Sequence, residues 1–264
     1  MPESSSEPCH RTGSKQRQTP GTKALAEEES AALAIDDLKL RPIGWIESPL
    51  QDKLLIPRQP GLAPSVHCRL RLVSDYAREE AWRGIEGFSY LWLLWHCHKT
   101  TGWSPTVRPP RLGGNERVGV FASRSTHRPN PLGLSAVKLL EVEQQHDISL
   151  VLQGADLLDG TPIFDVKPYL PYSDALPASG GFAPEQPEWL PVSFDDGAEL
   201  WLAGEPAERR QQLIELLRQD PRPGYRRGKP QPEKTYGARF AGVDIRWRVT
   251  ASGVKINKPQ PLVD

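Results

Sequence analysis

The densest group of polar side chains in the sequence lies between Val107 and Leu134, where the chain reads VRPPRLGGNERVGVFASRSTHRPNPLGL. Five arginines stand here among glycines and prolines. The planar guanidinium group of arginine can form paired hydrogen bonds with a phosphate or a carboxylate. The Gly113-Gly114 pair lets the backbone approach a ligand closely. The stretch therefore indicates an anion-binding loop, with an ordinary structured loop that carries surface arginines as the alternative.

A second polar segment, DLLDGTP over residues 156–162, contains two carboxylates that could accept hydrogen bonds from an amine or a ribose. A plain turn at Asp159-Gly160 is the alternative interpretation. The next segment, DVKPYLP over residues 165–171, reads as the end of a strand. Because side chains alternate along a strand, we expect Asp165 and Lys167 on one face, beside Tyr169.

A third segment, DPRPGYRRGK over residues 220–229, places a tyrosine among cations. RNA-binding surfaces combine phosphate contacts with base stacking in this way. A solvated linker between two elements would have a similar composition, and the sequence leaves both interpretations open.

Other chemistry has less support in the sequence. There is no G-x-G-x-x-G, G-x-S-x-G or H-E-x-x-H motif, and GYRRGK at 224–229 is one residue short of a P-loop. His96 and His98 could chelate a metal from one strand face, but their spacing to Cys68 or His127 matches no standard site. We therefore expect His98 to be a polar group that lines a pocket.

Composition limits the class of protein. The 264 residues carry 33 basic and 33 acidic side chains, so the chain as a whole is not attracted to nucleic acid and an RNA partner would need a local basic patch. The 27 prolines argue against a helical bundle. The 3 cysteines form no disulfide framework, which is typical of a reducing cytosol. No apolar run is long enough for a membrane span, and we expect no secretory signal.

The order of predicted elements favours a mainly β protein. Residues 1–38 are rich in Ser, Glu, Lys, Gln and Pro and are predicted to be a disordered extension. Short strands with Gly and Pro turns then point to a barrel or sandwich. Their predicted ranges are 43–46, 67–73, 88–97 (fully buried), 117–123, 135–142, 148–155 and 162–167, with a short helix over 75–83.

The C-terminal part predicts a separate, smaller unit. Residues 206–219 have the apolar periodicity of a helix that stops before Pro221. Strict alternation over 236–240 and 243–249, across Ala241-Gly242, predicts a β-hairpin. We therefore expect a barrel domain over 39–185 and a small α+β domain, a helix plus a hairpin, over 190–258.

Taken together, these segments resemble the TrmO (TsaA-like) family of tRNA methyltransferases. The resemblance rests on long runs with unusual Arg, Pro and Gly combinations in the family's order: IGWIESPLQDKLLIPRQPGLAP (43–64), TVRPPRLGGNERVGVFASRSTHRPNPLGLS (106–135), DLLDGTPIFDVKPYLPYSD (156–174) and DPRPGYRRG (220–228). It spans about residues 40–255.

The resemblance implies a compact, non-Rossmann β-barrel that binds S-adenosylmethionine, with a small C-terminal domain, in a cytoplasmic homodimer without a metal. It also implies methyl transfer to N6 of threonylcarbamoyladenosine at position 37 of a threonine tRNA. A non-catalytic barrel that binds S-adenosylmethionine or RNA is the first alternative. A metal hydrolase that uses His96, His98 and Cys68 is the second.

Site residues follow from the resemblance by motif. Implied cofactor contacts are Pro57, Arg58, Gln59, His98, Lys99, Arg124, Leu134, Asp156, Leu157, Leu158 and Asp159. The family often has Gln where Lys99 stands, so a contact there would use the backbone. Arg58 or Arg124 could hold the cofactor's carboxylate, and Asp156 or Asp159 its ribose or amine.

Two further groups of residues are predicted around the reaction. Candidates for orienting the acceptor or relaying its proton are Asp165, Lys167 and Tyr169. Predicted tRNA contacts are Arg111, Arg117, Arg128, Arg222, Tyr225, Arg226, Arg227 and Lys229, with Tyr225 as a stacking partner for a splayed base.

Overall fold

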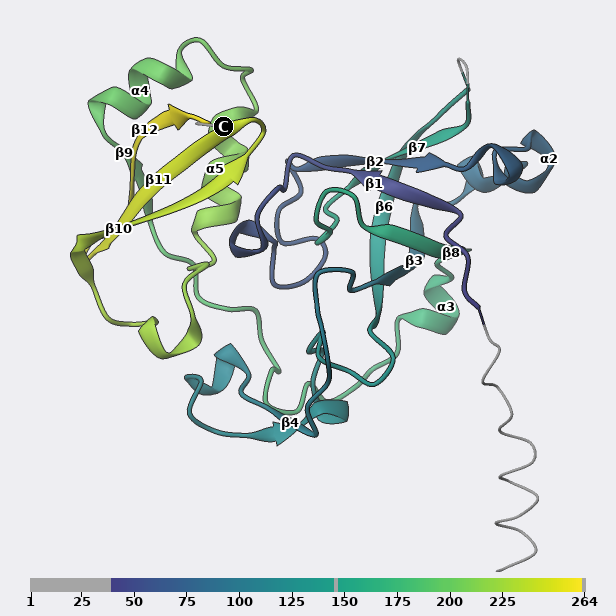
Figure 1. Cartoon of the computed structure of the whole chain (residues 1–264), viewed down its shortest axis with the longest axis horizontal. Helices are drawn as coiled ribbons and strands as arrows, with labels where there is room; N and C mark the ends of the chain where they lie inside the picture. Colours follow the sequence, from purple (N-terminus) through teal and green to yellow (C-terminus); the bar gives the residue numbers. More distant parts are fainter. Residues whose placement is uncertain (1–38, 145–146, 263–264) are drawn as a thin grey trace, which may run out of the picture. The chain divides into compact units, whose positions relative to one another are not determined.

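The computed structural model describes residues 39–144 and 147–262 (Figure 1). The predicted extension over 1–38 lies outside the described residues. From Arg41 onward the chain forms one compact unit.

A closed antiparallel barrel makes up the first part of this unit, and it confirms the mainly β prediction. Six strands follow one another around it in the order β1-β2-β7-β6-β3-β8. Their bounds are β1 (Gly44–Glu47), β2 (His67–Leu72), β3 (Tyr90–His96), β6 (Leu132–Glu143), β7 (Ser149–Gln153) and β8 (Pro162–Pro168). Closure leaves no exposed sheet edge. The barrel is filled by alternate, inward-facing side chains such as Leu70, Leu93, Leu150 and Ile163, which are fully buried.

The strand predicted to be fully buried, over 88–97, is buried on one face only. Leu91 and Leu93 face the barrel core, whereas Tyr90 is 46% exposed and Trp92 and Leu94 are half-buried. The strand is apolar on both faces because its outer face lines a pocket, which the sequence pattern does not distinguish from a core. Opposite Trp95 stands Gly133, where a Cβ would lie 2.2 Å from the indole ring.

The arginine-rich stretch predicted to hold a strand over 117–123 is mostly turn. It contains a two-residue ribbon, β4 (Thr106–Val107) and β5 (Val118–Gly119), and two 3-10 turns, η4 (Pro110–Leu112) and η5 (Val120–Ala122). Its prolines and glycines favour tight turns over extended pairing.

The C-terminal part is a four-stranded sheet with helices against it (Figure 1). The order is β10-β11-β12-β9. The elements are β9 (Val192–Phe194), α4 (Asp196–Leu202), α5 (Arg209–Leu217), β10 (Gln231–Phe240), β11 (Val243–Thr250) and β12 (Gly253–Pro261). The predicted hairpin is confirmed, because Ala241 and Gly242 turn it with φ of 49° and 82°. The predicted helix over 206–219 is shorter than expected, and β9 and β12 were not predicted.

One apolar core joins the C-terminal sheet to the segment that follows β1. Leu50 and Leu55 pack with Trp247, Phe240 and Leu213, all of them fully buried. Ala241 donates its N–H to the Pro49 carbonyl at 3.0 Å. The segment between β1 and β2 therefore lies against the C-terminal sheet while its two ends belong to the barrel.

The remaining short elements are connections. They are η1 (Lys53–Leu55), η2 (Ser74–Tyr76), α2 (Glu79–Trp82), η3 (Ile85–Gly87), α3 (Pro171–Asp174) and η6 (Gly224–Arg226). In the part of the chain that the structure describes, no helix is long and apolar enough to cross a membrane.

Candidate functional site

A pocket of about 1180 Å³ lies against the outer face of β3 and β6. Its apolar lining includes Trp92 and Leu94 from β3, Leu134 and Ala136 from β6, and Leu158. Loops over 56–60, 97–101 and 123–128 supply the polar lining. An apolar wall with a few polar groups is the usual character of a small-molecule site.

The pocket collects residues that are far apart in the sequence. Of the predicted cofactor contacts, nine line it: Pro57, Arg58, Gln59, His98, Lys99, Arg124, Leu134, Asp156 and Leu158. Leu157 and Asp159 do not line it. Leu157 is 1% exposed and packs inside the barrel, so its side chain is corrected from a cofactor contact to a core residue. Asp159 points elsewhere and accepts the Ser48 N–H at 2.9 Å.

Asp156 is one of two carboxylates that line this pocket. The Ser135 hydroxyl donates to its Oδ1 at 2.6 Å, and the Trp95 indole N–H donates to that hydroxyl at 3.0 Å. Burial raises the pKa of Asp156 to about 6, against the opposite effects of the Ser135 hydrogen bond and of nearby Arg124. A desolvated carboxylate with spare acceptor capacity suits a ligand that brings an ammonium or hydroxyl group.

Arg124 is the guanidinium that remains available to a ligand's carboxylate. It is exposed and donates to the Gln59 side-chain oxygen, which joins two of the predicted cofactor segments. Arg58 differs, because its Nη2 lies 3.1 Å from the Pro221 carbonyl and 3.2 Å from that of Arg222. Burial, followed by the nearby charge of Arg227, lowers the pKa of Arg58 to about 10. Because its Nη2 is held by these carbonyls, Arg58 is less available than Arg124 for a ligand's carboxylate.

His98 lies on the polar side of the pocket. Burial and then the charge of Lys99 lower its pKa, which favours the neutral imidazole. Burial raises the pKa of Cys97 to about 11 and that of Cys68, in the barrel core, to about 12. Within residues 39–144 and 147–262, no three His, Cys, Asp or Glu side chains are grouped so that they could hold a metal ion.

Of the three residues predicted to act around the reaction, only Tyr169 lines the pocket. Its ring packs on Trp92 with the centroids 5.6 Å apart. Asp165 and Lys167 form an exposed ion pair at 3.1 Å. They lie opposite Leu94 and Trp92 in the β3–β8 ladder and therefore share the outer face of the barrel with the pocket.

Sequence reasoning missed several pocket residues. Asp174 lines the pocket and accepts the Trp92 indole N–H at 2.9 Å and the Leu170 N–H at 2.8 Å. It lies within the DVKPYLPYSD run, where the run of prolines and aromatics was the available signal. Ser135, which orients Asp156, carried no signal of its own.

The two basic segments that the sequence separates by about 100 residues meet in the structure. A Cβ on Gly224 would lie 2.7 Å from the Pro110 Cα, and one on Gly114 would lie 3.2 Å from the Tyr225 nitrogen. Glycine is required here because η4 and η6 pack backbone against backbone. Arg111, Arg117, Tyr225 and Lys229 are exposed on these segments.

The other predicted tRNA contacts are less accessible. Arg222 is 1% exposed and its guanidinium is paired with Asp220 at 2.7 and 2.8 Å, so its assignment as a tRNA contact is wrong. Arg227 is half-buried and donates to the Gln219 and Asp220 carbonyls. Arg128 lines the pocket, with its guanidinium 5.4 Å from the Phe121 ring centroid. Arg226 donates to the Tyr236 hydroxyl at 3.2 Å.

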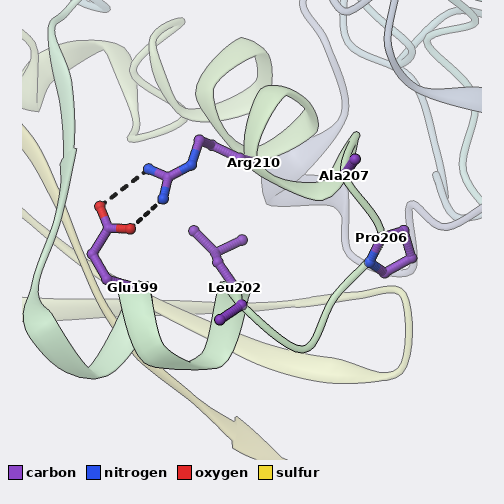
Figure 2. Close-up of a pocket in the computed structure, with 6 residues that line it drawn as sticks. Glu199, Leu202, Pro206, Ala207 and Arg210 are labelled. Atoms are coloured by element: carbon purple, nitrogen blue, oxygen red, sulfur yellow. Dashed lines mark hydrogen bonds and ion pairs between the residues drawn. The ribbon is translucent and has the colours of Figure 1, made fainter.

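A smaller pocket of about 360 Å³ lies between α4 and α5 (Figure 2). Figure 2 shows Glu199 and Arg210 paired across it, beside Leu202 and Pro206. The Arg210 guanidinium also lies 4.7 Å from the Phe194 ring centroid. The charges at this pocket satisfy each other, and none of the predicted site residues lines it.

The fold and the pocket define a class of protein: a closed β-barrel with a ligand pocket on its outer wall, followed by a small α+β sheet. Residues 45–175 match the family model described as the tRNA-methyltransferase O N-terminal domain, and residues 187–260 match the TrmO C-terminal domain. The chain belongs to the TrmO family of tRNA methyltransferases.

Individual relatives agree with this family. A tRNA (adenine(37)-N6)-methyltransferase of Escherichia coli K12 is 45% identical over 86% of this chain and all of its own length. A Pseudomonas aeruginosa protein described as an S-adenosylmethionine-dependent methyltransferase is 44% identical over 78% of this chain and 90% of its own. A crystal structure of TrmO from Pseudomonas aeruginosa superposes with a TM-score of 0.69, at 33% identity, over 84% of this chain and 97% of that chain.

Proposed function

We propose that this chain transfers a methyl group from S-adenosylmethionine to N6 of threonylcarbamoyladenosine at position 37 of threonine tRNA. The observation that carries the proposal is the pocket on the outer wall of β3 and β6. It gathers the Pro57–Gln59 segment, His98, Arg124 and Asp156. Among the relatives, one is named a tRNA (adenine(37)-N6)-methyltransferase and another an S-adenosylmethionine-dependent methyltransferase.

The residues of the pocket fit the cofactor's chemical groups. Arg124 would hold its carboxylate, and Asp156 would accept from its amine or ribose. Leu94, Leu134 and Leu158 offer apolar surface for the adenine and for the carbon chain beside the sulfur. The bound cofactor supplies a methyl group on a positively charged sulfur, and that charge is compatible with the aromatic faces of Trp92 and Tyr169.

The chain's own contribution to the reaction is alignment and removal of one proton. The acceptor nitrogen must lie in line with the carbon–sulfur bond, at the distance of a near-attack geometry. As the nitrogen–carbon bond forms and the carbon–sulfur bond breaks, the N6 proton has to leave. Tyr169, which lines the pocket, would orient the acceptor, and Asp165, paired with Lys167 on the same face, would relay the proton.

The basic surface at the packed η4 and η6 turns is proposed to hold the tRNA. Arg111, Arg117 and Lys229 offer positive charge for phosphates, and Tyr225, which is 56% exposed with the Arg226 guanidinium 5.4 Å from its ring centroid, would stack on a base. Arg226 and half-buried Arg227 add charge to the same surface. Arg128, which lines the pocket, would instead meet the base that enters it.

We further propose a barrel domain over 39–185, a small domain over 190–258 and a cytoplasmic homodimer. Support for the dimer comes from the outer face of β3 and β6, next to the pocket. Tyr90 and Leu140 are 46% and 41% exposed there. A face of large apolar side chains of this kind is typical of an interface.

A combined binding and transfer measurement tests the proposal. We expect S-adenosylmethionine to bind in a calorimeter and its tritiated methyl group to enter threonylcarbamoylated threonine tRNA. Binding without any label in the tRNA would favour the alternative of a non-catalytic barrel. Absence of both would contradict the assignment of the pocket.

A further inference from the structure

The segment Gln219–Arg222, which follows α5, is a buried polar turn between the cofactor pocket and the basic loop 222–229. Gln219, Asp220 and Arg222 are 3%, 7% and 1% exposed. Asp220 has a φ of 47°, in the left-handed region. A polar segment in such a conformation stays folded only where its surroundings hold it in place.

On one side, this buried polar turn is held by Arg58 of the pocket wall. The Arg58 N–H donates to the Gln219 side-chain oxygen at 3.1 Å. The Arg58 guanidinium Nη2 lies 3.1 Å from the Pro221 carbonyl, 3.2 Å from that of Arg222 and 3.5 Å from that of Asp220. Arg58 thus contacts each residue of the buried polar turn from a position between Pro57 and Gln59, which both line the pocket.

On the other side, the buried polar turn is hydrogen-bonded to the basic loop. The Arg222 guanidinium pairs with Asp220 and donates its third hydrogen bond to the Lys229 carbonyl at 2.9 Å. Arg227 donates to the Gln219 and Asp220 carbonyls at 3.1 and 3.2 Å. Both ends of loop 222–229 are therefore held by the same buried polar turn that Arg58 contacts.

At the pocket, the Arg124 guanidinium has two alternative acceptors: the Gln59 side chain and the carboxylate of a ligand. Arg124 donates to the Gln59 side-chain oxygen, and the Gln59 amide donates to the Arg58 carbonyl. A carboxylate ligand competes with Gln59 for Arg124, because both are acceptors for the same guanidinium. Cofactor binding would then change the hydrogen bonding of Gln59, next to Arg58.

We propose that Arg58 is a positioning residue that couples the cofactor pocket to loop 222–229, so that cofactor and tRNA bind cooperatively. This inference rests on the proposed function for its ligands, although the contacts themselves do not. Coupling between two sites is reciprocal, and a factor of about 5 to 150 is typical.

Affinity for threonine tRNA, measured with and without S-adenosylhomocysteine, tests the proposal in three proteins. The wild type should bind tRNA at least about fivefold more tightly with the ligand present. Arg58→Met keeps an unbranched side chain and removes the guanidinium donors. In this variant that ratio should fall to within about twofold of one. Arg218→Met is the matched control: Arg218 also bridges to the segment after β1, at the Leu62 carbonyl, but lines neither site, so it should keep the wild-type ratio.

Hydrogen exchange of the wild type gives a readout that depends on neither a variant nor tRNA. S-adenosylhomocysteine should slow exchange at the amides of residues 222–229. Unchanged exchange there, a wild-type ratio of one, or equal loss of coupling in both variants would overturn the proposal. Slowed exchange in a protein that neither binds nor methylates tRNA, lost in Arg58→Met, would keep Arg58 as the link between the pocket and residues 222–229 and contradict the proposed function instead.

Discussion

Arg124 is the side chain on which the proposed cofactor site depends most. The Nη2 of Arg58, its rival for a carboxylate, donates to backbone carbonyls, whereas Arg124 is exposed and its one hydrogen bond among the described residues goes to the Gln59 side chain. Hydrogen bonds to charged groups contribute about 1.5–3 kcal/mol.

Arg124→Ala should therefore bind S-adenosylmethionine roughly ten to a hundred times more weakly in calorimetry. Arg71→Ala is a suitable control, because Arg71 is an exposed arginine on β2 that pairs with Glu47 away from the pocket. Unchanged affinity in Arg124→Ala would remove this residue from the cofactor site.

Asp156 predicts a pH dependence of cofactor binding. Its pKa is raised to about 6, mainly by burial, so the carboxylate that would pair with an amine becomes protonated below that pH. Affinity should fall as the pH is lowered from about 7 to 5, and Asp156→Asn should bind weakly at every pH. Calorimetry of both proteins over this range checks it, and a flat wild-type profile would contradict it.

The same shift has a consequence for stability with the opposite direction. The folded-state pKa lies above the ordinary value of 3.8, so the folded protein binds more protons than the unfolded chain between about pH 4 and 6. The contribution of Asp156 to the free energy of unfolding therefore decreases as the pH rises through this window. Cofactor binding, which needs the charged form, offsets that loss.

At the scale of elements, the contact between η4 and η6 decides whether the two basic segments form one surface. A Cβ on Gly224 would lie 2.7 Å from the Pro110 Cα, so an added methyl group must push backbone apart. Overpacking of this kind costs about 1–3 kcal/mol. Gly119 offers a matched control, because a Cβ added there would have nothing within 4 Å and its φ is also negative.

Gly224→Ala should weaken tRNA binding by about tenfold, with little change in affinity for S-adenosylmethionine, while Gly119→Ala leaves both nearly unchanged. Filter binding and calorimetry measure the two affinities. Equal tRNA affinity in the two variants would mean that the packed turns do not form the tRNA surface.

Elements with local signals could be predicted from the sequence, and elements with distant partners could not. The β10–β11 hairpin was predictable because alternation and the Ala241-Gly242 turn lie within a few residues of each other. β9 has three residues and pairs in parallel with β12, about 60 residues later, so no local pattern marks it. The outer face of β3 looked buried because its aromatic residues line a pocket.

The same limit applies to the site. The sequence identified the polar segments, but not that the guanidinium groups of Arg58 and Arg222 are used inside the protein. Arg222 is paired with a carboxylate two residues away and with the Lys229 carbonyl, which requires the left-handed turn at Asp220. Composition does not show which cation of a basic run is buried inside the protein.

At the scale of the whole molecule, zero net charge describes the average of differently charged parts. Exposed Arg111, Arg117 and Lys229 lie on the two segments that pack together at η4 and η6, although the chain carries as many acidic as basic side chains. The molecule thus needs no net positive charge to hold a polyanion, because a local patch is sufficient at distances within a Debye length.

The most direct measurement of the central claim is the identity of the nucleoside that the protein methylates. Threonine tRNA with and without the threonylcarbamoyl group would be incubated with S-adenosylmethionine, digested to nucleosides and weighed by mass spectrometry. We expect one added methyl group on N6 of threonylcarbamoyladenosine from position 37, and none on the unmodified tRNA. A methyl group at another nucleoside, or no transfer to either tRNA, would contradict the proposed function.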